Sequence, residues 1–176
     1  MKILETERTI LREIVATDAG FVLDLLNQPS FIKYIGDRQV RTLEQAADYI
    51  ETRFAKSYQE NGFGMYLVEL KEDLKTSEIR NPKSEIGICG FVRRDTLPDP
   101  DLGFAFLPEF GKKGYALETA RAMMRYGRET LNLGRVLAIT TQDNENSVRL
   151  LEKLGFRFDG LIKMPGDPEE LKLFSA

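Results

Sequence analysis

The sequence predicts a single α/β domain over residues 1–176, built on a mixed, mostly antiparallel sheet with helices on both faces. Two observations lead to this expectation. Three strand-like segments follow one another in the middle of the chain, which indicates antiparallel hairpins. A strand-like segment, a long amphipathic helix and another strand-like segment then come in succession, which indicates one parallel crossover. A chain of 176 residues fits one domain of this kind.

The first third of the chain predicts one strand and two helices. Residues 10–14 are expected to form the strand, and residues 18–27 the first helix, with an apolar face. Thr42, followed by Gln45 three residues later, has the capping-box pattern that opens a second helix. In that helix apolar residues recur at i, i+3, i+4, i+7 and i+11, which predicts one buried stripe. The stripe consists of Leu43, Ala46, Ala47, Ile50 and Phe54.

The remaining elements complete the predicted sheet. Strands are expected at 65–70, 85–92, 101–107 and 136–141, and a final hairpin at 156–162 and 171–174. Helices are expected at 115–131 and 145–154, the second ending at Gly155, a residue common just past helix ends. The polar segment 71–84 is expected to connect two strands of one hairpin, because strand-like segments flank it.

Composition removes several classes of function. The net charge is −3, from 25 Lys and Arg against 28 Asp and Glu, which argues against nucleic acid as a main partner. With no histidine and a single cysteine, neither an internal disulfide nor an ordinary zinc site can form, so no metal is expected. The first 11 residues are charged, and no apolar stretch approaches the ~20 residues that cross a bilayer. We therefore expect a cytoplasmic protein with no membrane partner.

The segment 102–120 predicts a phosphate site, because a strand leads through a glycine-containing loop into a long helix. The first turn of a helix has free N–H groups and a partial positive charge, which suit a phosphate. Gly111 and Gly114 let the backbone approach a bulky anion, and Lys112 and Lys113 add charge. The nucleotide P-loop needs Ser or Thr after its lysine, whereas Gly114 follows Lys113. The dinucleotide G-x-G-x-x-G fingerprint is also missing, which leaves a pyrophosphate cradle of another type.

The loop 111–116, Gly-Lys-Lys-Gly-Tyr-Ala, resembles the Q/R-x-x-G-x-G/A loop of the GNAT N-acetyltransferases. Three further segments resemble the Rim-type branch, named for enzymes that acetylate the N-termini of ribosomal proteins. They are 4–12 (LETERTILR), 107–110 (LPEF) and 144–156 (NENSVRLLEKLGF). Because these segments occur in the family's order over nearly the whole chain, the resemblance implies a GNAT fold with a splayed central strand pair. It also implies acetyl-CoA as cosubstrate.

The resemblance also implies roles for individual residues. The strand before the loop would carry a bulge and splay from its neighbour. Its backbone groups would pair with the pantetheine arm and hold the thioester carbonyl, at Ala105, Phe106 and Leu107. Backbone N–H groups would bind the pyrophosphate, at Gly111, Lys112, Lys113, Gly114, Tyr115 and Ala116. Asn144 would bond the pantetheine, and Ser147 would lie near the thioester sulfur.

The sequence departs from the family at two positions, and the general base is open. Gly111 stands where the loop usually has Gln or Arg, and Leu151 stands where many members have a tyrosine as general acid. Ser147 or a water molecule must then supply that proton. Because histidine is absent, the base must be a carboxylate, a tyrosine or a chain of waters. Asp101, at the start of the strand, is the first candidate; Glu169 and Glu170, in the last hairpin, are weaker ones.

Each of these residues also has a simpler interpretation. Asn144 is a common helix cap, and serine is common in a first helical turn, where Ser147 lies. Lys112 and Lys113 could be ordinary solvated charges. Cys89, among apolar residues of a predicted strand, is expected to be a buried structural thiol rather than a nucleophile.

The expected activity is direct attack of a primary amine on acetyl-CoA, without a covalent enzyme intermediate, by a monomer or homodimer. The amine would belong to a protein N-terminus or to a small molecule. The alternative is a GNAT-fold module that binds acetyl-CoA as a sensor and performs no chemistry. Turnover with any amine distinguishes the two.

Overall fold

An eight-stranded mixed sheet forms the middle layer of the computed structural model, which describes residues 1–71 and 84–176. The strand order is β1-β2-β3-β4-β5-β6-β8-β7, and every neighbouring pair is antiparallel except β5 and β6, which are parallel. This arrangement confirms the mixed, mostly antiparallel sheet with one crossover. The strands are β1 (Lys2–Glu5), β2 (Thr9–Glu13), β3 (Met65–Leu70), β4 (Glu85–Val92), β5 (Asp101–Phe106), β6 (Leu137–Thr140), β7 (Arg157–Ile162) and β8 (Leu171–Ser175).

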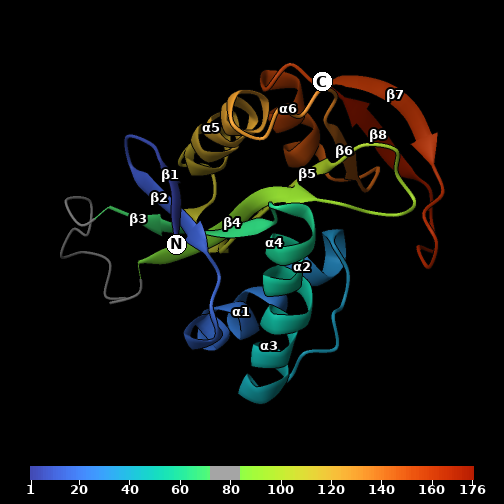
Figure 1. Cartoon of the computed structure of the whole chain (residues 1–176). Coiled ribbons are helices and arrows are strands. Elements are labelled where there is room, and N and C mark those ends of the chain that lie inside the picture. Colours follow the sequence, from blue (N-terminus) through green and yellow to red (C-terminus); the bar gives the residue numbers. More distant parts are fainter. Residues whose placement is uncertain (72–83) are drawn as a thin grey trace.

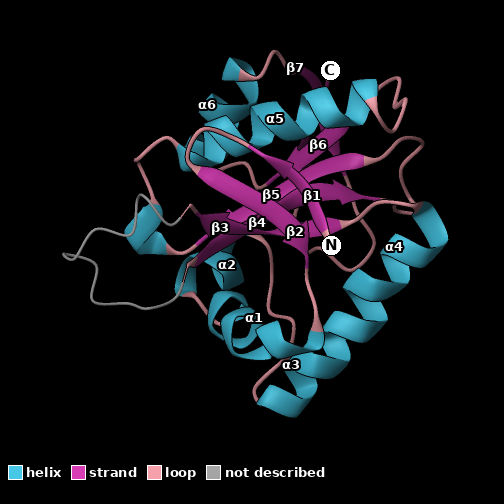
Figure 2. Ribbon diagram, turned by 60° about the vertical axis from the view of Figure 1, so that its left-hand side comes forward, coloured by secondary structure: helices cyan, strands magenta, loops and turns pink. Residues whose placement is uncertain are grey.

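Helices cover both faces of the sheet, as predicted (Figures 1 and 2). One face carries α1 (Ala19–Leu26), α2 (Pro29–Tyr34), α3 (Leu43–Tyr49) and α4 (Lys56–Asn61). The other face carries α5 (Tyr115–Glu129) and α6 (Glu145–Lys153). Helix α5 packs closely on the sheet, because a Cβ atom on Gly127 would lie 2.6 Å from Cζ of Phe91. Within residues 1–71 and 84–176, no helix combines the length and the apolar character needed to cross a membrane.

The second predicted helix begins at its expected cap and continues further than expected. The hydroxyl of Thr42 accepts the N–H of Gln45 at 3.1 Å, whereas the Gln45 side chain accepts from Arg41 instead of completing the capping box. A π-helical segment, Ile50–Ala55, joins α3 to α4. The stripe members Ala46, Ile50 and Phe54 are buried, as predicted. Leu43 was wrongly included, because it lies in the first turn and is 59% exposed.

Two short elements were not predicted from the sequence. Strand β1 has only four residues, two of them charged, and it forms the edge of the sheet beside β2. Helix α2 has six residues, of which Phe31 alone is buried. Neither element is long enough to show the periodicity from which helices and strands are recognised.

The expected hairpins are present. Strands β3 and β4 pair antiparallel, which confirms that the segment between them connects two strands, although residues 72–83 lie outside the described residues. The last two strands also pair antiparallel, with β8 inserted between β6 and β7. Gly155 ends α6 with a φ of 89°, the left-handed conformation predicted for this position.

Strands β5 and β6 separate along their length. In the described chain their pairing is confined to Asp101 and Leu137, where the Leu137 N–H also donates to the Pro100 carbonyl at 2.9 Å. Beyond this point the strands diverge toward their C-terminal ends, which confirms the splayed central pair. We call this gap the β5/β6 opening. The chain leaves β5 toward α5 and leaves β6 toward α6 at the open end.

Candidate functional site

The loop between β5 and α5 has the conformation of an anion cradle. After a short 3-10 turn, Pro108–Phe110, the backbone passes through positive φ at Lys112 (60°) and at Gly114 (83°), which is the N-cap of α5. The φ of Gly114 favours glycine. Gly111 has a φ of −65°, which any residue can adopt, so its backbone conformation does not require glycine. Backbones that alternate in this way can turn successive N–H groups toward one side.

A continuous run of backbone donors is free in this loop. The N–H of Gly111 bonds to the Pro108 carbonyl at 3.0 Å, and the N–H of Glu118 bonds to the Gly114 carbonyl at 3.0 Å. Between them, the N–H groups of residues 112–117 have no acceptor among the described residues. These donors lie at the positive end of a 15-residue helix, where an anion is stabilised. Gly111 belongs to the predicted cradle by position, but its N–H is already used.

Arg8, on the turn between β1 and β2, lies against this loop. Its Nη1 donates to the Lys113 carbonyl at 3.0 Å, and its guanidinium stacks 4.4 Å from the centre of the Tyr115 ring. Its Nε is 2.6 Å from Oε2 of Glu118. No local sequence pattern indicates a role for Arg8, because its partner Glu118 is 110 residues away.

Glu118 joins the β1–β2 turn to the first turn of α5. Its Oε1 accepts the hydroxyl of Thr6 at 2.6 Å and the N–H of Arg8 at 3.0 Å. Burial alone would raise the pKa of this carboxyl, but the hydrogen bonds from Thr6 and Arg8 outweigh burial and lower it. Glu118 is therefore ionised at neutral pH, and the cluster combines an ion pair with several hydrogen bonds.

The backbone of β5 presents alternate residues to the opening. In an antiparallel pair, every second residue turns its N–H and C=O toward the partner strand. Leu107 donates its N–H to the carbonyl of Ile86 in β4 at 2.9 Å. Ala105 lies two residues earlier, so its backbone groups also point toward β4. The backbone N–H and C=O groups of Phe104 and Phe106 therefore point away from β4, toward the β5/β6 opening.

The three residues expected to hold the thioester differ in where their backbone groups point. The Leu107 carbonyl accepts the N–H of Phe110 at 3.0 Å, so both backbone groups of Leu107 are used within the protein. Of Ala105, Phe106 and Leu107, only Phe106 presents backbone groups to the opening, and Phe104 joins it. The implied bulge is also not found, because β5 pairs with β4 in unbroken register over all of its described residues.

Asn144 and Ser147 begin α6 at the open end of the gap. The side-chain oxygen of Asn144 accepts the N–H of Ser147 at 3.2 Å, so the capping role of Asn144 is confirmed. The Asn144 amide nitrogen and the Ser147 hydroxyl have no hydrogen-bond partner in the described part of the chain and remain available to a ligand. Leu151, one turn further, is 1% exposed and packs in the core.

Asp101 lies at the closed end of the opening. Its carboxylate is buried, with 2% of the residue exposed, and it pairs with Nε of Arg94 at 2.8 Å. Asp101 is therefore a buried, ion-paired residue and not a solvated strand end. Burial raises its pKa, although the ion pair with Arg94 opposes the change. At ~3.3 Å per residue, roughly 16 Å of strand separates Asp101 from Phe106. Its role as general base stays a prediction.

The remaining titratable candidates lie elsewhere. Glu169 and Glu170 are exposed between β7 and β8, and the Glu170 carbonyl accepts from Gln142 at 3.0 Å. Cys89 is fully buried in β4, and burial raises the pKa of its thiol, which confirms a structural thiol.

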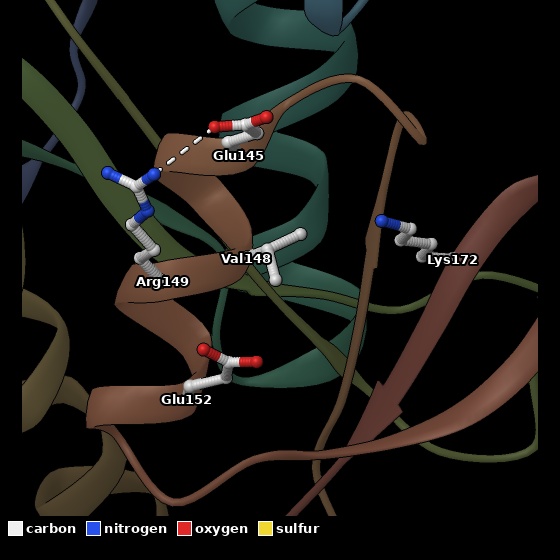
Figure 3. A pocket seen from close by; sticks show the side chains of 5 residues that line it. All are labelled: Glu145, Val148, Arg149, Glu152 and Lys172. Carbon is white, nitrogen blue, oxygen red and sulfur yellow. Dashed lines mark hydrogen bonds and ion pairs between the residues drawn. The ribbon is translucent and has the colours of Figure 1, made fainter.

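A surface groove lies between α6 and β8 (Figure 3). It is lined by Glu145, Val148, Arg149, Glu152 and Lys172. Glu145 and Arg149 form an ion pair of 3.2 Å along the helix, while Lys172 extends from β8 toward the helix. Because Glu145 is already paired with Arg149 and the groove contains none of the predicted site residues, we assign it no ligand.

Comparison with known proteins places these features in context. A family model described as "Acetyltransferase (GNAT) domain" matches residues 8–157. The N-acetyltransferase YoaA of Bacillus subtilis, whose function is uncharacterized, is 32% identical over 179 residues, covering 98% of this chain and 95% of YoaA.

Solved structures share the fold. The RimL ribosomal L7/L12 alpha-N-protein acetyltransferase, solved with coenzyme A, superimposes with a TM-score of 0.82 at 14% identity, covering 100% of this chain and 97% of that one. The spermidine N-acetyltransferase of Vibrio cholerae, solved with CoA and spermine, has a TM-score of 0.74 at 18% identity, covering 96% and 94%.

Proposed function

The chain belongs to the family of GNAT acetyltransferases and is therefore an acetyl-CoA-dependent N-acyltransferase, and we propose that its preferred acceptor is the free N-terminal amine of a peptide. The observation that carries the acetyl-CoA site is the run of free N–H groups at residues 112–117, beside a sheet that opens between β5 and β6. The acceptor rests on the resemblance of segments 4–12 and 144–156 to the Rim-type branch.

The residues around the opening fit the parts of acetyl-CoA. The pyrophosphate would bind the backbone donors of 112–117, with Lys112 and Lys113 exposed beside it. The pantetheine arm would add to β5 through the backbone of Phe104 and Phe106, which lacks a strand partner on that side. The free amide nitrogen of Asn144 would bond the same arm from the start of α6.

The proposed reaction is direct acyl transfer. The lone pair of the deprotonated amine forms a bond to the acetyl carbon, the carbon–sulfur bond breaks, and the thiolate takes up a proton. Backbone N–H groups facing the opening would stabilise the charge that develops on the carbonyl oxygen. The Ser147 hydroxyl would donate to the leaving sulfur. The proton that the ammonium loses would reach Asp101 through intervening water molecules, because Asp101 lies at the closed end of the opening.

The acceptor would reach the thioester from the face that carries α1 to α4, because the phosphates would bind on the other face, which carries α5 and α6 (Figure 2). Helix α2 borders this side, where Lys33 lies 3.4 Å from Asp143, next to Asn144. Small amines remain the second acceptor class, since the spermidine acetyltransferase of Vibrio cholerae shares the fold.

Thiol release from acetyl-CoA tests the proposal. The panel comprises short peptides with a free N-terminus, the same peptides with a blocked N-terminus, spermidine, and a hydroxyl compound. We expect the free peptides to give the highest kcat/KM and the blocked ones to be inactive. Activity with spermidine alone would assign the second acceptor class. Activity with hydroxyl compounds alone would refute amine transfer, and acetyl-CoA binding without any turnover would identify the sensor module instead.

A further inference from the structure

We infer that Arg8 is a positioning residue for acetyl-CoA, which acts by fixing the shape of the loop 112–117 rather than by binding the phosphates itself. This inference rests on the proposed binding of acetyl-CoA at that loop. It assigns a role in cosubstrate affinity to the turn between β1 and β2, far from the loop in sequence.

The contacts of Arg8 are of the kind that fix a backbone. One guanidinium nitrogen holds the carbonyl of Lys113 at 3.0 Å, in the middle of the loop. The planar group also stacks on Tyr115, the first residue of α5, at 4.4 Å from the ring centre. Loop carbonyls and N–H groups belong to the same peptide planes, so holding the Lys113 carbonyl also orients the N–H of Gly114.

The charge of Arg8 is already neutralised. Its Nε pairs with Oε2 of Glu118 at 2.6 Å, and Glu118 is ionised. The side chain of Arg8 is 31% exposed and that of Glu118 is 22% exposed, so the two charges compensate each other with little screening by solvent. A phosphate near this pair meets little net charge. Arg8 therefore contributes to binding by fixing the geometry of the loop.

The contacts of Arg8 support a loop in which Gly111 has no side chain to contribute. In the family this position usually has Gln or Arg, and glycine supplies no side chain to brace the loop. Arg8 reaches the loop from the other side, through Lys113 and Tyr115. The brace is therefore supplied by β1 and β2 in this chain.

Isothermal titration calorimetry with acetyl-CoA, without any acceptor, tests the inference. We expect Arg8→Gln to raise Kd roughly tenfold, the effect of losing one or two hydrogen bonds to a charged group. The matched control is Arg12→Gln on β2, the strand that follows the turn. Arg12 pairs with Asp18 and with Glu69, each at 2.8 Å, and its side chain is 23% exposed, but it makes no contact with the described loop. Arg12→Gln is expected to lower Tm and leave Kd unchanged.

Two further variants separate positioning from direct phosphate binding. Lysine keeps the charge but cannot hold Glu118 and the Lys113 carbonyl in one planar fork, so Arg8→Lys is expected to bind as weakly as Arg8→Gln. Glu118→Gln releases the Arg8 charge. If Arg8 bound the phosphates directly, this release would lower Kd; because the brace is lost, we expect Kd to rise. Together, Arg8→Gln and Glu118→Gln should weaken binding by less than the product of their separate effects.

The results that overturn the inference are distinct. An unchanged Kd in Arg8→Gln, a parental Kd in Arg8→Lys, or a lowered Kd in Glu118→Gln would each refute positioning while leaving the acetyl-CoA site in place. Failure of the parent protein to bind acetyl-CoA would instead refute the proposed site, and the inference with it. Should Arg8→Gln fail to fold, Arg8→Lys and Glu118→Gln carry the same test.

Discussion

The guanidinium of Arg8 lies directly against Gly114, with Nη2 3.2 Å from the position that a Cβ atom on the glycine would take. Gly114 also has a φ of 83°. A side chain at this position would therefore meet two obstacles, a backbone conformation that L-residues rarely adopt and the group that braces the loop.

Replacing Gly114 with valine is expected to weaken acetyl-CoA binding by roughly tenfold while the fold is retained, because displacing Arg8 costs about as much as removing its hydrogen bonds. Calorimetry and circular dichroism measure the two effects. The matched control is Gly62→Val, at the end of α4, where φ is 74° and no atom lies within 4 Å of the added Cβ. It carries the backbone strain without touching the loop. Parental affinity in Gly114→Val would show that the loop does not bind the cosubstrate.

The two lysines of the loop are expected to matter less than the backbone. Lys112 and Lys113 are exposed, and Nζ of Lys113 lies 5.6 Å from the centre of the Phe110 ring. Removing both as alanines should raise Kd for acetyl-CoA less than Gly114→Val does. The rise in Kd caused by removing the two lysines should shrink as salt rises from about 0.05 to 0.5 M, because exposed charges are screened. Lys56→Ala, on α4, serves as a control, and a salt-independent effect would contradict a purely electrostatic role.

Most of the sheet could be predicted, because its segments have clear periodicity and turn residues. The stripe Ala46, Ile50 and Phe54 and the cap at Thr42 were visible in the sequence. β1 and α2 were not, since four and six residues are too few to show a period. The order of β8 between β6 and β7 follows from pairings that no local pattern encodes.

The conformations of the glycine loop and of the start of α6 could be predicted from short motifs, whereas long-range hydrogen bonding could not. Gly114 and Asn144 have conformations that short motifs indicate. Which backbone groups of β5 are free depends on its register with β4, which turns the backbone groups of Ala105 toward β4 and the N–H of Leu107 toward Ile86. The link between Arg8 and Glu118 depends on the packing of the β1–β2 turn against α5, for which the sequence has no local signal.

Asp101→Asn is expected to change both the pH dependence of stability and the catalytic rate, and the first effect follows from burial. Its pKa is raised in the folded protein, mainly by burial, so the neutral carboxyl is favoured on folding. The stability that this group contributes is therefore full below pH ~4 and is lost as the pH rises through the raised pKa. Asparagine cannot titrate, so the destabilisation caused by Asp101→Asn should be largest near pH 4 and shrink toward pH 7, as followed by urea unfolding.

The same variant tests the proposed base. If Asp101 accepts the proton of the ammonium, Asp101→Asn lowers kcat by ~10²–10⁴-fold with little change in Kd for acetyl-CoA. Asp99→Asn is the control, because Asp99 pairs with Arg135 at 2.7 Å and precedes the strand by two residues. A folded Asp101→Asn protein with parental kcat would remove Asp101 from the mechanism and leave the proton to water.

Protonation of the leaving sulfur is the other open step. CoA leaves as a thiolate, and a thiol pKa of ~8.5 means that this departure needs little assistance. A general acid should therefore contribute at the low end of the usual ~10²–10⁴-fold range. Leu151, where many members of the family have a tyrosine that acts as general acid, is buried in the core. Ser147 offers a hydroxyl at the open end of the gap, in the first turn of α6.

Ser147→Ala is expected to lower kcat by roughly ten- to a hundredfold at saturating acetyl-CoA, with little change in Kd, because the backbone N–H of residue 147 still bonds Asn144. Ser147→Thr keeps a hydroxyl and should retain most of the activity. Leu151→Tyr should not rescue Ser147→Ala, since forcing a larger ring into the core costs ~1–3 kcal/mol of stability and leaves its hydroxyl buried. Full activity in Ser147→Ala, measured with a confirmed acceptor, would assign the proton to water and leave Ser147 only its place in the first turn of α6.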